Sequence, residues 1–183
     1  MNTPSSPLID SFGRKHNYLR ISLTERCNLR CSYCMPVDGV QLSPAEHLMN
    51  ADEIFSIAQS FVKFGVTKIR LTGGEPLVRK DFPKILETLS TLDVELSITS
   101  NAVSIDRHIE LLKQTGVKTV NISLDTLSAE KFHDITFRNY FDKVYQNILK
   151  LIDEGFKVKI NAVRISTALI FTLKPSSISF KIF

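Results

Sequence analysis

The chain has 183 residues, of which 43% are hydrophobic and 23% are charged, and its formal net charge is +4 at pH 7. This composition is ordinary for a globular protein with one domain and a core of useful size. It argues against a membrane protein, because no apolar run is long enough to span a bilayer, and against a nucleic-acid partner, because there is no dense Lys/Arg block. The polar start, Met1 to Pro7, lacks the basic and apolar regions of a signal peptide.

Five segments with the alternating pattern of strands follow a polar tail over residues 1–17. They lie near Leu19–Thr24, Thr67–Thr72, Val94–Asn101, Val117–Asp125 and Lys157–Val163. In the first segment, for example, Leu19, Ile21 and Leu23 alternate with polar residues. The resulting sheet is therefore expected to have one apolar face and one polar face.

Helical patterns separate these strands. The first helix is expected to begin at a capping box formed by Asn50 and Glu53 and to end at Gly65. Further helices are expected after Asp81, over about 104–116 and over about 140–155. Repeated β–α units predict an α/β fold with parallel strands joined by right-handed crossovers.

The polar strand face permits two interpretations. One is a sheet with a solvated face, as in many antiparallel α+β proteins. The other is a partial (β/α) barrel whose inner surface is a polar cavity, which differs from a closed eight-stranded barrel filled with branched apolar side chains. The partial barrel is favoured, and it would bring Arg20, Arg70 and Lys159 to a site suited to phosphate or carboxylate groups.

The three cysteines of the chain, Cys27, Cys31 and Cys34, lie together in the spacing C-x-x-x-C-x-x-C. A [4Fe–4S] cluster held entirely by protein takes four thiolates, so three would leave one iron free to bind a small molecule. The alternative is a structural zinc site, which needs a fourth ligand from one of the histidines. None has the usual spacing: they are His16, His47, His108 and His133. The cysteine spacing suits a metal in a reducing cytoplasm better than disulfides.

A second motif, Gly73-Gly74-Glu75-Pro76, ends the second predicted strand. Two glycines let a backbone approach a ligand closely, and ligands of α/β folds gather at the carboxyl ends of strands. Alone, the motif would indicate no more than a β-turn before a helix.

Together the two motifs resemble the radical S-adenosylmethionine (SAM) superfamily. Further segments narrow the resemblance to its GTP 3′,8-cyclase family of molybdenum cofactor biosynthesis. They are F-G-R at 12–14, Y-L-R-I-S-L-T-E-R-C-N at 18–28, T-S-N at 99–101, N-I-S-L-D at 121–125, F-R-N at 137–139 and K-I-N-A-V at 159–163. In order, they cover most of the chain.

The resemblance implies that Cys27, Cys31 and Cys34 hold a [4Fe–4S] cluster whose fourth iron is chelated by SAM. Reductive cleavage of SAM would give a 5′-deoxyadenosyl radical, which abstracts a ribose hydrogen from GTP so that C3′ joins C8 of the guanine. By position, the resemblance assigns SAM binding to Tyr33, Gly74 and Ser123, and GTP binding to Arg20, Arg70, Thr99 and Lys159. An electron donor is a further expected partner, and a homodimer remains open. Alternatively, Arg20 and Arg70 pair with Glu25, Glu75 or Glu95, and Tyr33 packs over the cluster.

The resemblance ends after Val163. Residues 164–183 contain no acidic residue and no cysteine, whereas the family continues with a sixth strand and a second set of three cysteines that binds the guanine. We therefore expect a core over 18–163 with five of six strands, an exposed edge at the fifth, and an aberrant or poorly ordered tail from a truncation or frameshift that impairs GTP cyclisation. The alternatives are a radical SAM enzyme for another substrate and a zinc-stabilised, non-catalytic module.

Overall fold

A computed structural model of the chain describes residues 7–35, 39, 41–163 and 178–182. Within these residues, six parallel strands form one sheet and follow each other across it in chain order. The strands are β1 (Tyr18–Ser22), β2 (Lys68–Thr72), β3 (Glu95–Ser100), β4 (Thr119–Ser123), β5 (Lys157–Ala162) and β6 (Ile178–Ile182). The predicted α/β fold with parallel strands is confirmed.

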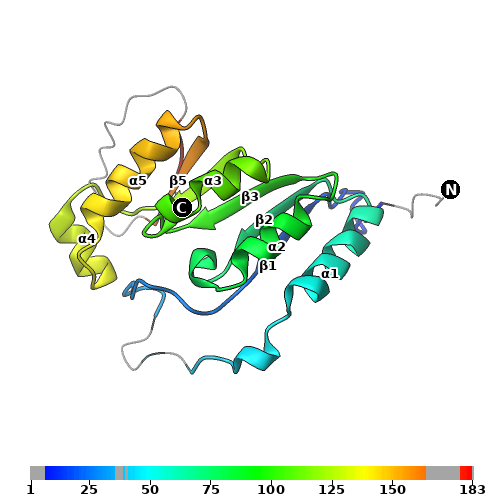
Figure 1. The fold of residues 1–183 in the computed structure, drawn as a ribbon, viewed down its shortest axis with the longest axis horizontal. Coiled ribbons are helices and arrows are strands. Elements are labelled where there is room, and N and C mark those ends of the chain that lie inside the picture. The colour runs from blue at the N-terminus through cyan, green and yellow to red at the C-terminus, as the bar shows by residue number, and fades with distance from the viewer. Residues whose placement is uncertain (1–6, 36–38, 40, 164–177, 183) are drawn as a thin grey trace.

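The helices gather on one face of the sheet (Figure 1). They are α1 (Ala51–Lys63), α2 (Phe82–Leu89), α3 (Ile109–Gln114), α4 (Ala129–Thr136) and α5 (Phe141–Asp153), with short 3₁₀ helices η1 (Ala45–His47), η2 (Pro76–Val78) and η3 (Ile105–Arg107). Because each strand lies beside the one before it, right-handed crossovers all turn the same way and place their helices on the same side. Among the described residues, no helix is long and apolar enough to cross a lipid bilayer.

The hydrophobic core lies between the sheet and these helices. Ile69, Leu71 and Val158 are fully enclosed, and Val144 and Ile148 of α5 join the same core. Along β2 and β5 the buried residues alternate with more exposed polar ones. The predicted division into an apolar and a polar face is therefore confirmed for β2 and β5. In β3 and β4 the polar residues Ser97 and Asn121 are buried as well.

The start of α1 matches its sequence signature. The side-chain oxygen of Asn50 accepts hydrogen bonds from the N–H groups of Asp52 and Glu53, each at 3.0 Å, and the Glu53 carboxylate accepts one from the N–H of Asn50 at 2.8 Å. This capping box satisfies N–H groups that have no partner within the helix. The helix ends at Lys63, and the chain turns at Gly65 with a φ of +92°.

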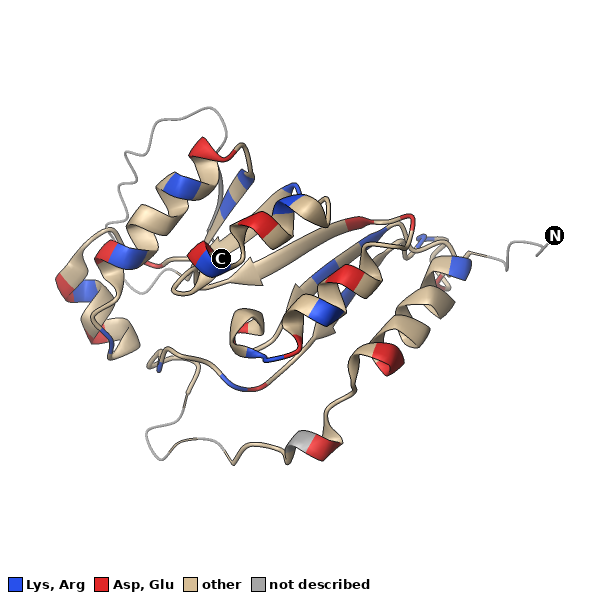
Figure 2. Cartoon of the chain, in the orientation of Figure 1, with Lys and Arg blue, Asp and Glu red and all other residues tan. Residues whose placement is uncertain are grey.

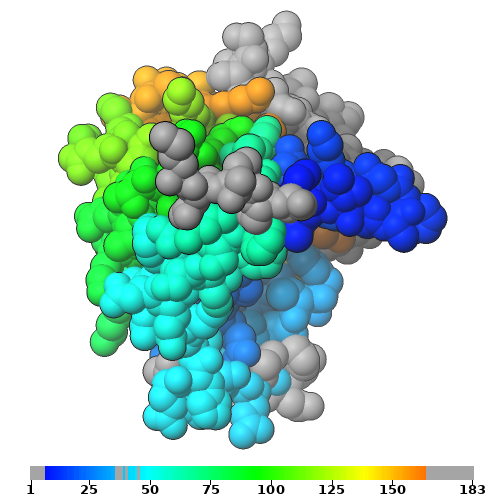
Figure 3. Space-filling view, turned by 90° about the vertical axis from the view of Figure 1, so that its right-hand side faces the viewer, coloured from blue at the N-terminus to red at the C-terminus, as the bar shows by residue number. Residues whose placement is uncertain are grey.

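The segment before β1 lies beside the end of α1. Ile9 and Lys15 form an isolated antiparallel bridge, and the N–H of Leu8 donates to the carbonyl of Phe64 at 3.2 Å. Figure 3 shows this segment in blue, projecting beside the helix. The described part of the predicted tail over residues 1–17 is therefore tied to the domain.

The sequence pattern did not indicate α4. The Oγ atom of Ser128 accepts a hydrogen bond from the N–H of Lys131 at 3.4 Å, and Phe132 and Thr136 are buried. The helix ends where Phe137 adopts a left-handed conformation with a φ of +52°. With so few apolar residues, the segment lacks the hydrophobic repeat that identifies longer helices.

The prediction that the sixth strand is missing is wrong. Strand β6 pairs in parallel with β5, from Val158 opposite Ile178 to Ala162 opposite Ile182. The segment I-S-F-K-I is rich in residues that favour strands, and the edge of β5 offers unpaired N–H and C=O groups for such an addition. The fifth strand is therefore not an edge. The rest of the predicted tail, residues 164–177 and 183, lies outside the described residues.

The variant Asn50→Ala should lower the free energy of unfolding by about 1 kcal/mol, because it removes the cap of α1. Urea unfolding monitored by circular dichroism would measure the change. The variant Asn139→Ala, at an exposed position outside the helices, is the control. Equal stability of the two variants would contradict a stabilising cap.

Candidate functional site

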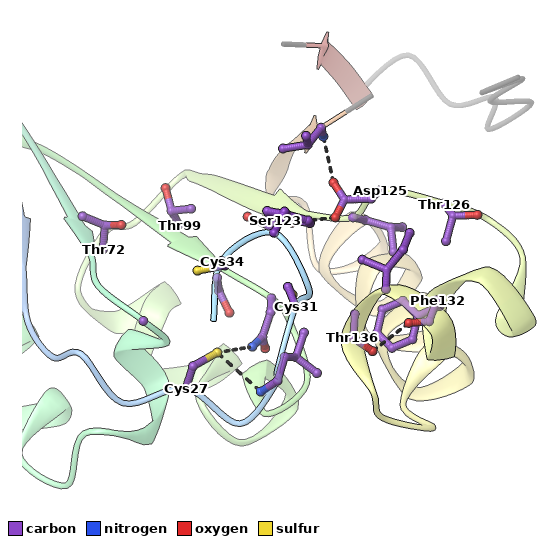
Figure 4. A pocket seen from close by; sticks show the side chains of 18 of the residues that line it. Cys27, Cys31, Cys34, Thr72, Thr99, Ser123, Asp125, Thr126, Phe132 and Thr136 are labelled. Atoms are coloured by element: carbon purple, nitrogen blue, oxygen red, sulfur yellow. Dashed lines mark hydrogen bonds between the residues drawn. The ribbon is translucent and has the colours of Figure 1, made fainter. Parts of the chain in front are cut away.

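A cavity of about 310 Å³ opens at the carboxyl ends of the central strands (Figure 4). Its walls come from the loop after β1, from the ends of β2, β3 and β4, and from α4. Ligands of parallel α/β sheets bind at this edge. The size lies at the lower end of the range of about 300–1,000 Å³ that is typical of sites for small molecules.

The three cysteines all line this cavity. Cys27 and Cys31 are partly buried, whereas Cys34 is exposed. The carbonyl of Cys31 accepts hydrogen bonds from the N–H groups of Cys34 and Met35, each at 2.9 Å, which closes a tight turn around the last two thiols. Figure 4 shows Cys27, Cys31 and Cys34 on the loop after β1, beside the residues of the strand ends. The structure thus brings the three cysteines together beside the strand ends.

The end of α4 holds this cysteine loop in place. The N–H of Arg30 donates to the carbonyl of Thr136 at 3.0 Å, and the N–H of Ser32 donates to the carbonyl of Ile135 at 2.8 Å. The last carbonyls of a helix have no partner within it, so these bonds satisfy groups on both segments. The helix that the sequence did not reveal is therefore a support of the cysteine loop.

The paired glycines pack the turn after β2 against the start of the cysteine loop. The N–H of Gly74 donates to the carbonyl of Thr24 at 2.6 Å, and the N–H of Glu75 donates to the carbonyl of Arg26 at 2.8 Å. A Cβ atom added to Gly74 would lie 2.5 Å from the carbonyl oxygen of Arg26. These glycines were expected to admit a ligand, and the structure gives them a further reason, because they let two segments of backbone touch.

Burial changes the acidity of the thiols. It raises the pKa of Cys31 to about 11, with further contributions from the nearby Cys27 and Asp125. Burial likewise raises the pKa of the Cys27 thiol. Because metals bind the thiolate form, metal binding at this loop must displace protons.

Tyr33 bridges the cysteine loop to the end of β4. Its hydroxyl donates to Oδ2 of Asp125 at 2.6 Å, and Oδ1 of the same carboxylate accepts the N–H of Val163 at 2.8 Å. Burial is the main cause that raises the pKa of the Tyr33 hydroxyl, followed by the bond to Asp125. Asp125 therefore links the cysteine loop to the ends of two strands.

Glu75 is a buried carboxylic acid beneath the cavity, with only 1% of its surface exposed. Its Oε2 accepts the N–H of Asn101 at 2.7 Å, and its Oε1 accepts the hydroxyl of Ser100 at 2.9 Å and the N–H of Leu77 at 3.2 Å. Burial raises the pKa of Glu75 to about 7, against the opposing effect of these three bonds. The side chain thus joins the turn after β2 to the turn after β3.

The three thiols fit the donor set of an iron–sulfur cluster. Within the described parts of the chain, no three His, Cys, Asp or Glu side chains are placed to hold one metal ion. A zinc ion needs its ligands to converge on one point. In an iron–sulfur cluster each cysteine binds a different iron, so three thiols around one cavity fit its donor set.

The residues expected to bind SAM line the cavity together with the thiols. They are Tyr33, Gly74 and Ser123, and Thr99, which was expected to bind GTP, joins them. Tyr33 is 49% exposed, so its ring remains accessible beside the loop. The structure therefore places these residues around the same cavity as the thiols, whereas their roles and ligands remain predictions.

The basic residues expected to bind GTP lie on the polar strand face, outside the lining of this cavity. Arg20 on β1 is directly opposite Arg70 on β2, and Lys159 on β5 is opposite Asn121 on β4. Figure 2 shows basic residues along the strands as well as on the helices. The strand pattern therefore brings Arg20 and Arg70 together as neighbours.

The alternative of ion pairs for Arg20 and Arg70 is not found in the described residues. The three carboxylates in question have other partners: Glu25 accepts from Ser43, Glu75 from Ser100 and Asn101, and Glu95 pairs with Lys68. Instead, the guanidinium of Arg70 lies 5.3 Å from the centre of the Tyr18 ring, and its Nε donates to Oγ of Ser97 at 3.5 Å.

Sequence reasoning missed several residues of the site. Asn101 and Asp125 each come one or two residues after a strand end, so polar residues at the carboxyl ends of predicted strands could have indicated them. Phe132 and Thr136 also line the cavity. They lie on α4, whose sequence gave no signal.

The chain matches the family model described as the radical SAM superfamily over residues 21–168. It is 51% identical over 162 residues to "Molybdenum cofactor biosynthesis protein 1" of Mus musculus, covering 87% of this chain and 26% of that protein. It is 50% identical over 165 residues to "GTP 3′,8-cyclase, mitochondrial" of Arabidopsis thaliana, covering 88% and 42%, respectively. It is 47% identical over 161 residues to "GTP 3′,8-cyclase" of Listeria monocytogenes, covering 86% and 48%. The chain thus spans about a quarter to a half of the length of these curated relatives.

Solved structures share the fold. The crystal structure of Streptococcus suis SuiB bound to S-adenosylmethionine has a TM-score of 0.69 at 24% identity, covering 83% of this chain and 33% of that chain. The structure of anSMEcpe with bound AdoMet has a TM-score of 0.63 at 19% identity, covering 80% and 42%.

The raised pKa of Glu75 predicts a dependence of stability on pH. The folded chain holds this proton up to about pH 7, whereas the unfolded chain releases it near the ordinary value of 4.5. Between these values the folded state binds more protons, so the free energy of unfolding should fall as the pH rises through that interval. The variant Glu75→Gln should lose less stability between pH 5 and pH 8 than the wild type in urea unfolding.

The variant Glu87→Gln is the control for this measurement, because Glu87 lies exposed on α2. It should keep the pH dependence of the wild type. The same loss of stability in all three proteins would show that Glu75 does not titrate in this range.

Proposed function

The chain belongs to the radical SAM superfamily, and we propose that it acts in molybdenum cofactor biosynthesis as a GTP 3′,8-cyclase that uses a [4Fe–4S] cluster and SAM. Support comes from identities of 47–51% to proteins named for this activity or this pathway. The observation that carries the proposal is the cavity in which the three thiols meet Tyr33, Gly74 and Ser123.

In this proposal, Cys27, Cys31 and Cys34 bind three irons and leave the fourth for the amino and carboxylate groups of SAM. When bound and reduced, the cluster supplies the electron that cleaves SAM to methionine and a 5′-deoxyadenosyl radical. The chain itself positions the thiols through the two backbone bonds to the end of α4. The proposal also requires an external electron donor. It places the chain in a reducing compartment such as the cytoplasm, where free thiols persist. A homodimer remains a prediction.

The SAM site of the proposal uses backbone and side chains that already line the cavity. Gly74 offers a surface without a side chain at the end of β2, and Ser123 offers a hydroxyl at the end of β4. The ring of Tyr33, held by its bond to Asp125, offers a face for the adenine. The volume of about 310 Å³ suits a small cofactor rather than a macromolecule.

The GTP site of the proposal extends from Thr99 at the cavity over the polar strand face to Arg20, Arg70 and Lys159. Guanidinium groups bind phosphate oxygens in pairs of parallel hydrogen bonds. The contacts of Arg70 with the Tyr18 ring and with Ser97 restrict its guanidinium, so less conformational entropy is lost when a triphosphate binds. The site would therefore hold the triphosphate on the sheet and direct the ribose towards SAM.

The metal site can be tested by counting iron after anaerobic reconstitution with iron and sulfide. The wild type should hold about four irons per chain, with an EPR signal that changes on addition of SAM. The variant Cys34→Ser should lose most of this iron. The variant Ser32→Ala, in the same loop, should keep it, since only the backbone N–H of Ser32 bonds to α4. One zinc and no iron in the wild type would contradict the proposal.

The nucleotide site can be tested by isothermal titration calorimetry with GTP. The variant Arg70→Ala should weaken binding about tenfold or more, because a hydrogen bond to a charged group is worth about 1.5–3 kcal/mol. The variant Lys84→Ala removes a positive charge from the helical face and should leave the affinity nearly unchanged. Equal weakening by both variants would assign the effect to net charge and would contradict a GTP site at Arg70.

A further inference from the structure

We propose that Asn101 is a positioning residue for the first cysteine, and that its N–H···S hydrogen bond to Cys27 raises the reduction potential of the cluster. This inference rests on the proposed function, because it concerns a thiolate that holds the cluster. The resemblance assigned no ligand to Asn101, which lies directly after β3 and lines the cavity.

The carboxamide of Asn101 is fully engaged and 7% of the residue is exposed. Its Nδ2 lies 3.6 Å from Sγ of Cys27 and donates to Oδ1 of Asn28 at 2.6 Å. Its Oδ1 accepts the N–H of Val103 at 3.0 Å. Because the N–H of Val103 can only donate, the oxygen of the carboxamide must face it and the NH₂ group must face the sulfur. The donor orientation towards Cys27 is thus imposed by the surroundings.

The turn that carries Asn101 is held from below by Glu75. This buried carboxylate accepts the N–H of Asn101 at 2.7 Å and the hydroxyl of Ser100 at 2.9 Å. The Ser100 hydroxyl in turn accepts the N–H of Ala102 at 2.9 Å. Ala102 has a φ of +62°, a conformation that residues with a side chain rarely adopt. A strained backbone conformation persists when the surrounding structure fixes it. Here the fixed turn places the side chain of Asn101 beside the thiol of Cys27.

A second buried asparagine holds the same turn without touching sulfur. Nδ2 of Asn147, on α5, donates to the carbonyl of Ala102 at 2.7 Å. Asn147 is 6% exposed, so its burial matches that of Asn101. Asn101 thus contacts the thiol, whereas Asn147 contacts only the backbone of the turn. Variants of the two residues can therefore distinguish these two roles.

Cys27 also receives a hydrogen bond from the N–H of Leu29, at 3.4 Å between nitrogen and sulfur. Two N–H donors thus point at this sulfur. Hydrogen bonds to the sulfurs of an iron–sulfur cluster are among the factors that set its potential. They withdraw electron density from the thiolate and stabilise the reduced state, which carries one more negative charge. Reduction adds one electron from an external donor and leaves the three cysteine thiolates bound.

The test is an EPR-monitored redox titration of the reconstituted full chain, with dithionite as the electron donor. The variant Asn101→Ala should shift the equilibrium constant of reduction about tenfold towards the oxidised cluster, which is about 59 mV to more negative potential for one electron. The variant Asn101→Asp keeps the size and the acceptor oxygen for Val103 but loses the donor, and it should shift the potential in the same direction. The variant Asn147→Ala should keep the wild-type potential.

The outcomes separate this inference from the proposed function. A wild type that binds no iron would overturn both. Wild-type iron content with an unchanged potential in both Asn101 variants would overturn the inference alone, and so would an equal shift in Asn147→Ala, which would assign the effect to the turn. Iron lost from the Asn101 variants but kept in Asn147→Ala would support the positioning of Cys27.

Discussion

The site depends on main-chain hydrogen bonds that hold the cysteine loop from two sides. On one side the N–H groups of Arg30 and Ser32 bond to the last carbonyls of α4, and on the other the chain before the loop pairs with Gly74 and Glu75. Both partners carry groups whose burial without a bond would cost stability. The place of the thiols is therefore set by backbone segments remote in sequence, and the thiols line the cavity together with Leu29 and Tyr33 of the same loop.

The order of the strands gives the sheet one face that packs in the core and one face that keeps polar residues. The helices between β1 and β5 cover one face (Figure 1), and the apolar side chains of the strands form the core beneath them. The opposite face keeps its polar residues, among them the opposed pair Arg20 and Arg70. Changes on the polar face can alter binding while the core that stabilises the fold stays intact.

The strand alternation of Leu19–Thr24 and the capping box at Asn50 were readable from the sequence, because both are local patterns with a direct physical cause. The grouping of Thr99 and Ser123 beside the thiols followed from the edge at which parallel strands end. Helix α4 and strand β6 were not predicted, because α4 buries few residues and β6 depends on pairing with β5. The partners of Asn101 could not be predicted either, since they come from distant turns and from a backbone conformation of Ala102 that alanine disfavours.

The left-handed conformation of Ala102 means that the turn after β3 is strained. A left-handed alanine lies above its relaxed energy, and the hydrogen bonds of Ser100 to Glu75 and to the N–H of Ala102 hold the turn in this conformation. Glycine at position 102 would adopt this conformation without strain, and it would also give the turn more conformational freedom. Alanine allows fewer backbone conformations than glycine. The strain at Ala102 therefore accompanies a more precise position of the neighbouring Asn101 carboxamide.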